Sequence, residues 1–429
     1  MTQLHLHPLV VRTNRFLTPI IVAVLLVVTL LAAIGRADDH SSARAVAMGG
    51  AFTVLASGPT AARFNPANLG LSGRKNSGLE LIGLGASVTN NSFTLADYNK
   101  YSGAYLTSAD KLDILSKVPN EGLKLSIDVD VSTMALAVGH FAASVEGRAA
   151  ADVNLSKDII DLVFNGNTYA DTIDVTGSYS SAVSYGSAGA SFGFPLFQNG
   201  TRQLAVGLTG KYLRGIGIEE VTDLQGGIAT YATGFQGAGH VIARTATGGA
   251  GYALDLGAAM TLNKTYACGV KIESFLSRIR WNKQTEERGY LFSFDTMTMA
   301  NADADYIVSD NFTRDIPAFT TSLPARLTVG FGKTSGRLLW AIDWEQGFRT
   351  APGASTKPRL AAGAEWSLWS FLPLRAGYAV GGNRNASLSV GSGLKFFGFY
   401  LDAAAVTGSS FSGYSSRGIN VAFATGVQF

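Results

Sequence analysis

The feature that most constrains this chain is a period-two alternation of apolar side chains that recurs along most of its length. In 252–262 the even positions carry Tyr, Leu, Leu, Ala, Met and Leu, whereas the odd positions are small or polar and include Asp255. The same alternation covers 338–345, 360–368 and 388–396. Because successive side chains of a β-strand point to opposite faces, the pattern predicts strands that each have one apolar face.

The opposite face of these segments is rich in Gly, Ser and Ala and carries few charges. Gly accounts for 50 of the 429 residues, and only 15% of the residues are charged, against about 25% in typical soluble domains. A soluble sheet turns a face rich in Lys, Glu and Thr to water, whereas a membrane barrel turns apolar side chains to lipid. The composition therefore favours a membrane barrel.

Alternating segments, separated by Gly, Asn, Ser and Asp, number about fourteen between Leu79 and Phe429. Lipid offers the backbone no hydrogen-bond partner, so a sheet that spans a membrane must close on itself. The sequence therefore predicts an all-β fold, a closed antiparallel transmembrane β-barrel of about fourteen strands.

The start of the chain has the composition of an export signal. Two arginines without an acidic residue precede an uncharged apolar stretch at 17–34, and Gly35 and Ala37 place small residues where a signal peptidase reads them. We predict a cleavable signal peptide at 1–37 and a mature chain, exported to the bacterial outer membrane, that begins near Asp38. The alternative is an N-terminal membrane anchor, because the apolar stretch is close to the shortest transmembrane helix.

The charges of the mature chain balance. Three of the 34 Lys and Arg residues lie in the predicted signal peptide, which leaves as many basic residues as the 31 acidic ones. A nucleic-acid backbone requires clustered excess Lys and Arg, so we expect no nucleic-acid partner. Cys268 is the only cysteine, which excludes an internal disulfide and any metal site that needs paired thiolates.

The sequence offers little for catalysis. A nucleophile needs a base beside it, and the plausible bases in the barrel region are His140 and His240, which we place in a turn and a loop. Nucleophile-elbow, phosphate-loop and His-Glu-x-x-His motifs do not occur, and we interpret the glycine-rich stretch 248–251 as a barrel turn. We therefore expect no enzymatic activity, no cofactor and no metal.

Several segments depart from the strand pattern. Short helices are predicted near 107–118 and 156–164, where they either pack against the barrel mouth or bind a partner. We interpret the aromatic-rich stretches 222–240 and 289–316 as long loops.

A β-bulge is predicted at Ser274–Phe275. Before this point the outward residues are even-numbered, and after it they are odd-numbered and include Ile279 and Trp281. An extra residue in one strand produces such a change of phase.

The last predicted strand ends on an aromatic residue. Val427 and Phe429 resemble the C-terminal insertion signal of outer-membrane barrels, although Ala424 stands where that signal often has Gly. The resemblance implies that the barrel assembly machinery and outer-membrane lipid are partners of this chain.

The segment between the leader and the first strand is rich in small residues and too short for a core of its own. It contains Arg-Ala-Val-Ala-Met-Gly-Gly-Ala-Phe at 44–52 and Asn-Pro-Ala at 65–67. These motifs resemble the N-terminal hatch of the bacterial long-chain fatty acid transporter superfamily of outer-membrane barrels, which includes the attachment barrels of the type IX secretion system. The stretches 110–119 and 358–381 resemble a branch of that superfamily without an assigned function.

The resemblance implies a hatch at 38–75 that fills the lumen of a barrel at 76–429. The hatch residues that it identifies are Arg44, Met48, Gly49, Gly50, Asn65, Pro66 and Ala67. Gly and Ala allow close backbone approach, and an Asn-Pro pair favours an extended turn. The hatch is either a permanent plug or a movable gate.

The alternation also turns charged side chains into the predicted lumen. They are Asp255, Lys271, Glu273, Asp343, Glu345, Arg359, Glu365, Arg375 and Lys395. These groups either form pairs that hold the hatch to the wall or bind the polar head of an amphipathic ligand, with Arg359 or Arg375 meeting a carboxylate.

Two functions fit these features. The first, implied by the superfamily, is passive transport of hydrophobic small molecules across the outer membrane, with hatch movement and lateral release into the membrane. The second is a plugged barrel that acts as a protein-interaction or secretion-associated scaffold. An apolar-lined pocket beneath the loops favours transport, and a broad exposed apolar patch favours a scaffold.

Overall fold

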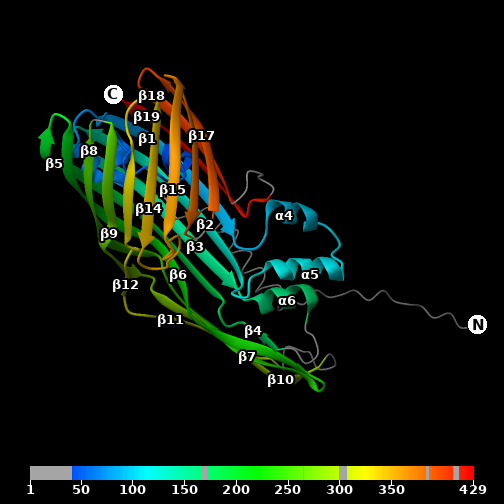
Figure 1. Ribbon diagram of the computed structural model, residues 1–429. Helices are drawn as coiled ribbons and strands as arrows, with labels where there is room; N and C mark the ends of the chain where they lie inside the picture. The colour runs from blue at the N-terminus through cyan, green and yellow to red at the C-terminus, as the bar shows by residue number, and fades with distance from the viewer. Residues whose placement is uncertain (1–40, 167–171, 264, 299–306, 383–385, 409–414) are drawn as a thin grey trace, which may run out of the picture. The chain divides into compact units, whose positions relative to one another are not determined.

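The computed structural model describes residues 41–166, 172–263, 265–298, 307–382, 386–408 and 415–429 (Figure 1). All of these residues belong to one compact unit. The predicted signal peptide at 1–37 lies outside the described residues.

The described strands form one antiparallel sheet. They are β1(Gly78–Asn90), β2(Leu123–Val138), β3(Phe141–Leu155), β4(Thr172–Asp174), β5(Tyr179–Asn199), β6(Arg202–Tyr231), β7(Gly234–Ala246), β8(Gly248–Leu262), β9(Tyr266–Lys283), β10(Glu286–Met297), β11(Val308–Asp315), β12(Phe319–Thr321), β13(Arg326–Lys333), β14(Leu338–Gly347), β15(Arg359–Trp369), β16(Leu372–Gly381), β17(Ala386–Phe396), β18(Phe399–Gly408) and β19(Gly418–Gln428). The helices are α2(Ala43–Ala47), α3(Ala61–Phe64), α4(Leu95–Tyr101), α5(Ser108–Lys117) and α6(Lys157–Asn165), with 3-10 helices η1(Gly58–Thr60) and η2(Pro66–Gly70).

Within the described residues, the sheet closes into a barrel of fourteen wall strands. β7 and β8 lie end to end and together form the wall strand next to β6. The next wall strand consists of β9 and β10. The one after it consists of β11, β12 and β13. The short β4 pairs only with the extended end of β6. β1 pairs with β19, with Leu84 opposite Phe423, and this pairing closes the ring. The predicted closed antiparallel barrel is confirmed.

The two ends of the barrel differ in their connections. At the end that carries the C-terminus, tight turns join neighbouring strands, and His140 lies in one of them, between β2 and β3. At the other end, longer connections carry α4, α5 and α6 (Figure 1). Short turns of outer-membrane barrels face the periplasm, so the three helices lie on the extracellular side.

Four strands, β6, β7, β10 and β11, continue beyond the rest of the wall on the extracellular side (Figure 1). β6 has 30 residues, whereas a tilted strand crosses a membrane with about 9–11. This extension contains 222–240 and most of the described part of 289–316, so the interpretation of these stretches as loops was wrong. Glycines obscure the alternation here, and aromatic rings of the next strand cover them, as Phe292 covers Gly239.

Two further local interpretations were wrong. His240, expected in a loop, lies within β7, and its Nε2 is 2.9 Å from Asp223 Oδ2 of β6. The stretch 248–251 begins β8 instead of forming a turn. A Cβ on Gly251 would lie 1.8 Å from the carbonyl oxygen of Arg278, so glycine here serves close approach between strands.

A β-bulge lies at the predicted place in β9. Ser274 has a φ of 51°, and its backbone N–H donates to the buried Asp255 carboxylate at 2.8 Å. The pairing with β8 slips there by two residues instead of one, so the outward residues remain even-numbered. Ile279 and Trp281 are therefore fully buried inside the barrel, and the prediction that they face outward was wrong.

The extracellular helices pack on the rim of the barrel. α5 lies within the segment 107–118 where the sequence predicts a helix, and α6 begins after its cap Ser156. Buried Leu115, Val118 and Ile160 form one apolar cluster with partly buried side chains of β2 and β3. Of the two roles considered for these helices, the structure shows the first, packing against the barrel mouth. α4 was not predicted, because its seven residues carry no apolar repeat.

Lys117 joins α5 to α4. Its Nζ is 2.7 Å from Asp97 and 2.8 Å from Asp113. The hydrogen bond from Lys117 lowers the pKa of Asp113 to about 2. Asp113 therefore stays ionised, and its link to Lys117 persists, until the pH falls toward that value.

Among the described residues, no helix has the length and apolar character needed to cross a membrane.

Candidate functional site

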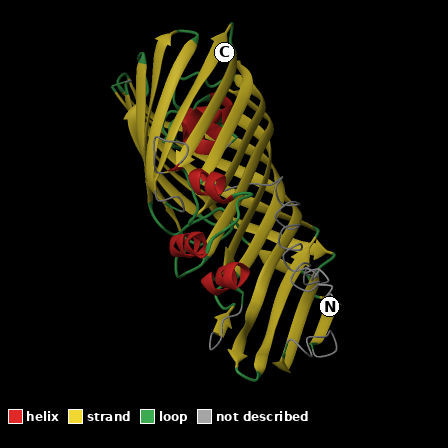
Figure 2. Ribbon diagram, turned by 90° about the vertical axis from the view of Figure 1, so that its right-hand side faces the viewer, coloured by secondary structure: helices red, strands yellow, loops and turns green. Residues whose placement is uncertain are grey.

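Residues 41–77 run inside the barrel, where Figure 2 shows short helices enclosed by strands. α2 packs against β16 to β19, and η2 packs against β5, β6 and β8. Ser42 caps α2 by accepting a hydrogen bond from Ala45 N–H, and Asn65 caps η2 by accepting one from Ala67 N–H at 3.1 Å. The two motifs of the sequence thus form the two ends of a compact segment, called the hatch below, within the lumen.

Glycines of the wall allow the hatch backbone to approach closely. A Cβ on Gly377 of β16 would lie 2.2 Å from Gly49 N, and a Cβ on Gly207 of β6 would lie 2.3 Å from Ala67 N. Real Cβ atoms do not approach other atoms so closely. The small residues on the polar face of the strands therefore form the surface against which the hatch packs.

An ion-pair cluster fixes α2 to the wall. Arg44 Nε is 2.7 Å from Glu365 Oε2, and the same oxygen is 2.7 Å from Arg375 Nε. Arg375 Nη1 is in turn 2.6 Å from Asp402 Oδ1. The side chain of Arg375 is fully buried in this cluster, so it joins wall carboxylates and is not accessible to a ligand.

Two further wall side chains bind the hatch backbone. Asp343 Oδ2 accepts hydrogen bonds from Phe52 N–H and Thr53 N–H, both at 2.9 Å. Arg359 donates to the Gly49 carbonyl. Charged groups of the wall therefore replace the hydrogen bonds that this part of the hatch does not form within itself.

The second half of the hatch is held in the same way. Arg63 Nη2 is 2.8 Å from Glu80 Oε2, and Lys271 donates to the Arg63 carbonyl. Asn65 Nδ2 donates to the Ala258 carbonyl of β8 at 3.1 Å. The side chain of Asn65 thus caps η2 and ties it to the wall at once.

Cavities lie on both sides of the hatch. The inner cavity, of about 110 Å³, lies beside the hatch and is lined by Gly49, Gly50, Arg63, Glu146, Lys271 and other side chains. The outer cavity, of about 520 Å³, opens among the extracellular ends of the strands and is lined by Tyr179, Val183, Ile218, Arg244, Pro324, Lys357 and others. The periplasmic vestibule, of about 1000 Å³, includes Arg44, Arg74, Lys395 and Phe396.

The inner and outer cavities adjoin each other. Residues that line both include Arg148, Tyr185, Ser274, Leu323, Arg326 and Arg359. The inner cavity and the periplasmic vestibule, by contrast, share no lining residue within the described chain. Hatch residues line both of these cavities, so the hatch lies between the inner cavity and the periplasmic vestibule.

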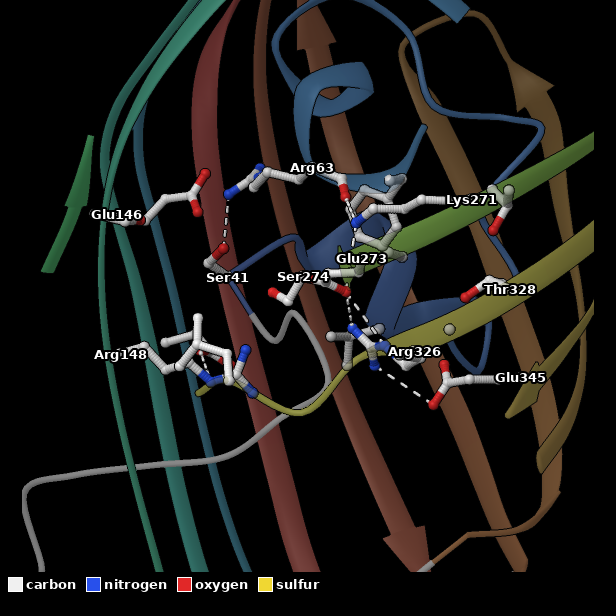
Figure 3. A pocket seen from close by; sticks show the side chains of 18 of the residues that line it. Ser41, Arg63, Glu146, Arg148, Lys271, Glu273, Ser274, Arg326, Thr328 and Glu345 are labelled. Atoms are coloured by element: carbon white, nitrogen blue, oxygen red, sulfur yellow. Dashed lines mark hydrogen bonds and ion pairs between the residues drawn. The ribbon is translucent and has the colours of Figure 1, made fainter. Parts of the chain in front are cut away.

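Charged side chains surround the inner cavity (Figure 3). Arg326 Nη2 is 2.5 Å from Glu273 Oε2, and its Nη1 is 3.4 Å from Glu345 Oε1. Glu146 Oε1 and Arg148 Nη2 are buried and have no hydrogen-bond partner among the described residues. Because Arg148 Nε is 3.7 Å from Asp130 Oδ1, one oxygen of Glu146 and one guanidinium nitrogen of Arg148 remain for a polar ligand.

The sequence analysis predicted some of the charged lumen groups and missed others. Asp343, Glu345, Arg359, Glu365 and Arg375, which the alternation places inward, do lie in the lumen. The following were missed: Arg63, Glu80, Glu146, Arg148, Arg326 and Asp402. The period-two pattern of β3 carries the signal for two of them, because Glu146 and Arg148 alternate with the outward Val145 and Gly147. Val427 lies near the end of β19, the strand that closes the barrel against β1, and Phe429 follows directly after this strand.

No group of three His, Cys, Asp or Glu side chains in the described part of the chain is placed to hold a metal ion.

The closed wall and the enclosed N-terminal segment define the class: an outer-membrane β-barrel with a hatch in its lumen. Solved structures share this fold. The toluene transporter TodX of P. putida aligns with 13% identity and a TM-score of 0.54 over 92% of this chain and 99% of that chain. The toluene transporter TbuX of Ralstonia pickettii aligns with 14% identity and a TM-score of 0.54 over 91% of this chain and 99% of that chain. A Pseudomonas aeruginosa FadL homologue aligns with 12% identity and a TM-score of 0.50 over 92% of this chain and 99% of that chain.

These similarities confirm the predicted resemblance at the level of the fold. The profile of a family of unknown function, DUF5723, matches residues 66–241, from the second hatch motif into the extension. A comparison with curated protein sequences gives no match.

Proposed function

We propose that this protein carries predominantly hydrophobic, amphipathic small molecules across the outer membrane, without catalysis. The observation that supports this most directly is the pair of adjoining cavities on the extracellular side of the hatch. A ligand enters the outer cavity, moves to the inner cavity, and passes on when the hatch shifts. The solved proteins of similar fold include two described as toluene transporters.

The lining of the two cavities favours a ligand with a polar head. Val183, Ile218 and Leu323 offer apolar contacts, but charged side chains stand among them. A wholly apolar molecule would deprive these charges of water without replacing it, which costs free energy. A polar head that reaches Glu146 or Arg148 satisfies an atom that otherwise lacks a hydrogen bond.

Arg359 connects ligand binding to the hatch. It lines both cavities and donates to the Gly49 carbonyl. A carboxylate that binds Arg359 competes with this hydrogen bond and weakens the hold on the first hatch motif. Arg375, the other arginine proposed from the sequence, does not serve this purpose because it is buried among carboxylates.

The bulge in β9 offers a lateral route into the membrane. Ser274 lines both cavities, and Phe275 beside it is exposed on the outside. We expect Ser274→Cys, in a Cys268→Ala background, to react several-fold faster with a lipid-soluble maleimide than Ser389→Cys. Ser389 also lines the inner cavity and is also buried, but it lies in β17, away from the bulge. Equal rates at the two positions would exclude a lateral route here.

Native mass spectrometry of the full-length barrel, extracted gently from its own membrane, tests the proposed function. We expect fatty or other amphipathic molecules to be retained at a fixed stoichiometry, because the cavities enclose the ligand on the extracellular side of the hatch. Replacement of Arg359 by Gln should lower the retained fraction. A barrel that never retains a small molecule would contradict transport.

A scaffold for other proteins is the second candidate. The segment of α4 and α5 exposes Tyr98, Tyr105 and Leu112 on the extracellular side, and such apolar groups suit a protein contact. In the same measurement, a reproducible protein partner without a small ligand would favour this function.

A further inference from the structure

Arginines stand on the outer wall of the barrel where its apolar surface ends. On β9 the outward side chains are apolar up to Leu276 and are then Arg278 and Arg280. On β6 the outward Tyr212 is followed by Arg214. All three arginines are exposed.

The strand register places these arginines next to one another. Arg214 pairs with Ala250 of β8, and Ala250 pairs with Arg280 of β9. Neighbouring strands are about 4.8 Å apart, so Arg214 and Arg280 are about 10 Å apart across a small residue that long side chains can cover. One row below, Tyr212 pairs with Tyr252, and Tyr252 pairs with Arg278. The three guanidinium groups can therefore converge on one ligand.

Packing inside the barrel fixes the outward direction of these side chains. Leu213, which precedes Arg214, and Ile279, which lies between Arg278 and Arg280, are fully buried with Trp281 in an apolar cluster on the lumen side. Because side chains alternate along a strand, Arg214, Arg278 and Arg280 must point away from the lumen.

Their height places these arginines at the outer edge of the membrane. Tyr266, with Phe331 and Trp340, forms an aromatic group at the periplasmic end of β9. Tyr266 and Arg278 pair with Leu262 and Tyr252 of β8, which are ten residues apart because the bulge adds two residues to β9. This spacing corresponds to about 25 Å along the membrane normal for a strand tilted by about 40°. The apolar band of a bacterial barrel is about 25 Å tall, so the arginines lie among the lipid head groups of the outer leaflet.

These arginines have no acidic partner within the described residues, and no hydrogen bond of their side chains is found there. Other arginines of the same region are paired: Arg244 with Glu220 at 2.7 Å and Arg288 with Glu286 at 2.9 Å. The patch thus has a net charge of three with nothing in the described chain to balance it.

We propose that Arg214, Arg278 and Arg280 form a binding site for the phosphate groups of an outer-leaflet glycolipid. Guanidinium groups bind phosphate oxygens in pairs of parallel hydrogen bonds, and tyrosines such as Tyr212 and Tyr252 suit the boundary between head groups and acyl chains. The lipid spans β6, β8 and β9, so its acyl chains lie beside the bulge at Ser274.

The test compares lipids that differ only in phosphate. The purified full-length barrel in a neutral maltoside detergent is titrated with diphosphorylated lipid A and with its phosphate-free form, and the bound lipid is counted by native mass spectrometry. We expect one diphosphorylated lipid A to be retained preferentially. Each Arg→Gln substitution should weaken its binding about fivefold, and the triple variant on the order of 100-fold. The matched control is Arg288→Gln, an exposed arginine outside the patch, which should bind as the wild type does.

Three outcomes would overturn the proposal. They are unchanged lipid A binding by the triple variant, equal binding of the phosphate-free lipid, and complete displacement of lipid A by inorganic phosphate, which would indicate an ion site instead of a lipid site. The triple variant must first show the heat-dependent gel mobility of a folded barrel. If it does not, the single variants carry the comparison. Transport of small molecules plays no part in this readout.

Discussion

Replacement of Gly377 by Ala should unseat the first hatch motif and open the lumen to small solutes. The new Cβ would lie 2.2 Å from both Gly49 N and Met48 C, and these are backbone atoms that no side-chain rotation can move away. The hatch must shift as a body, with a loss of stability of about 1–3 kcal/mol for an overpacked contact. Leakage of small sugars from liposomes that contain the purified barrel measures the opening.

Gly189→Ala is the matched control for this substitution. Gly189 lies in β5 on the lumen side, but its added Cβ would come no closer than 3.4 Å to another atom, the Ser144 Oγ, which is an ordinary contact. We expect this variant to be as tight as the wild type. Wild-type leakage and stability in Gly377→Ala would show that the hatch does not rest against β16.

Replacement of Arg375 by Met should cause the largest loss of stability among single wall substitutions. Its guanidinium lies between Glu365 and Asp402, at 2.7 Å and 2.6 Å, with no exposed surface. Removal of one partner from a buried ion pair leaves an uncompensated charge, which typically costs about 3–5 kcal/mol. Equilibrium unfolding by urea in lipid vesicles measures the difference.

Two further variants separate the buried charge from the general effect of losing an arginine. Arg375→Met combined with Asp402→Asn removes the stranded charge and should recover a large part of the stability. Arg314→Met removes an exposed pair with Glu287 on the extension and should cost at most about 1 kcal/mol. A loss in Arg375→Met no larger than that in Arg314→Met would contradict the buried cluster.

The barrel could be predicted from the sequence because its signal is local and repeated. The two-residue period of segments such as 252–262 is a property of each strand, and closure follows from the lack of water in lipid. The same period placed Asp343 and Glu365 on the lumen side. It could not show that Glu365 meets Arg44, because the two residues are 321 positions apart and are joined only by the folding of the hatch into the barrel.

The errors of prediction have equally local causes. Trp281 was placed outward because the bulge was taken to contain one extra residue, and two extra residues restore the original phase. The extension was taken for loops because glycines such as Gly239 interrupt the apolar face, and only the neighbouring strand shows that Phe292 covers the gap. The cavities depend on contacts between distant strands and have no counterpart in sequence spacing.

The position of the hatch also bears on the order in which the barrel assembles. The hatch directly precedes β1, and β1 with β19 forms the pair that closes the ring. A Cβ on Gly83 of β1 would lie 2.3 Å from the Ser41 carbonyl oxygen, so this seam is shaped to the hatch. A segment bound to strands on opposite sides of the lumen cannot be threaded easily into a finished ring. We therefore expect the sheet to curl around a hatch that is already in place, before its two edges meet.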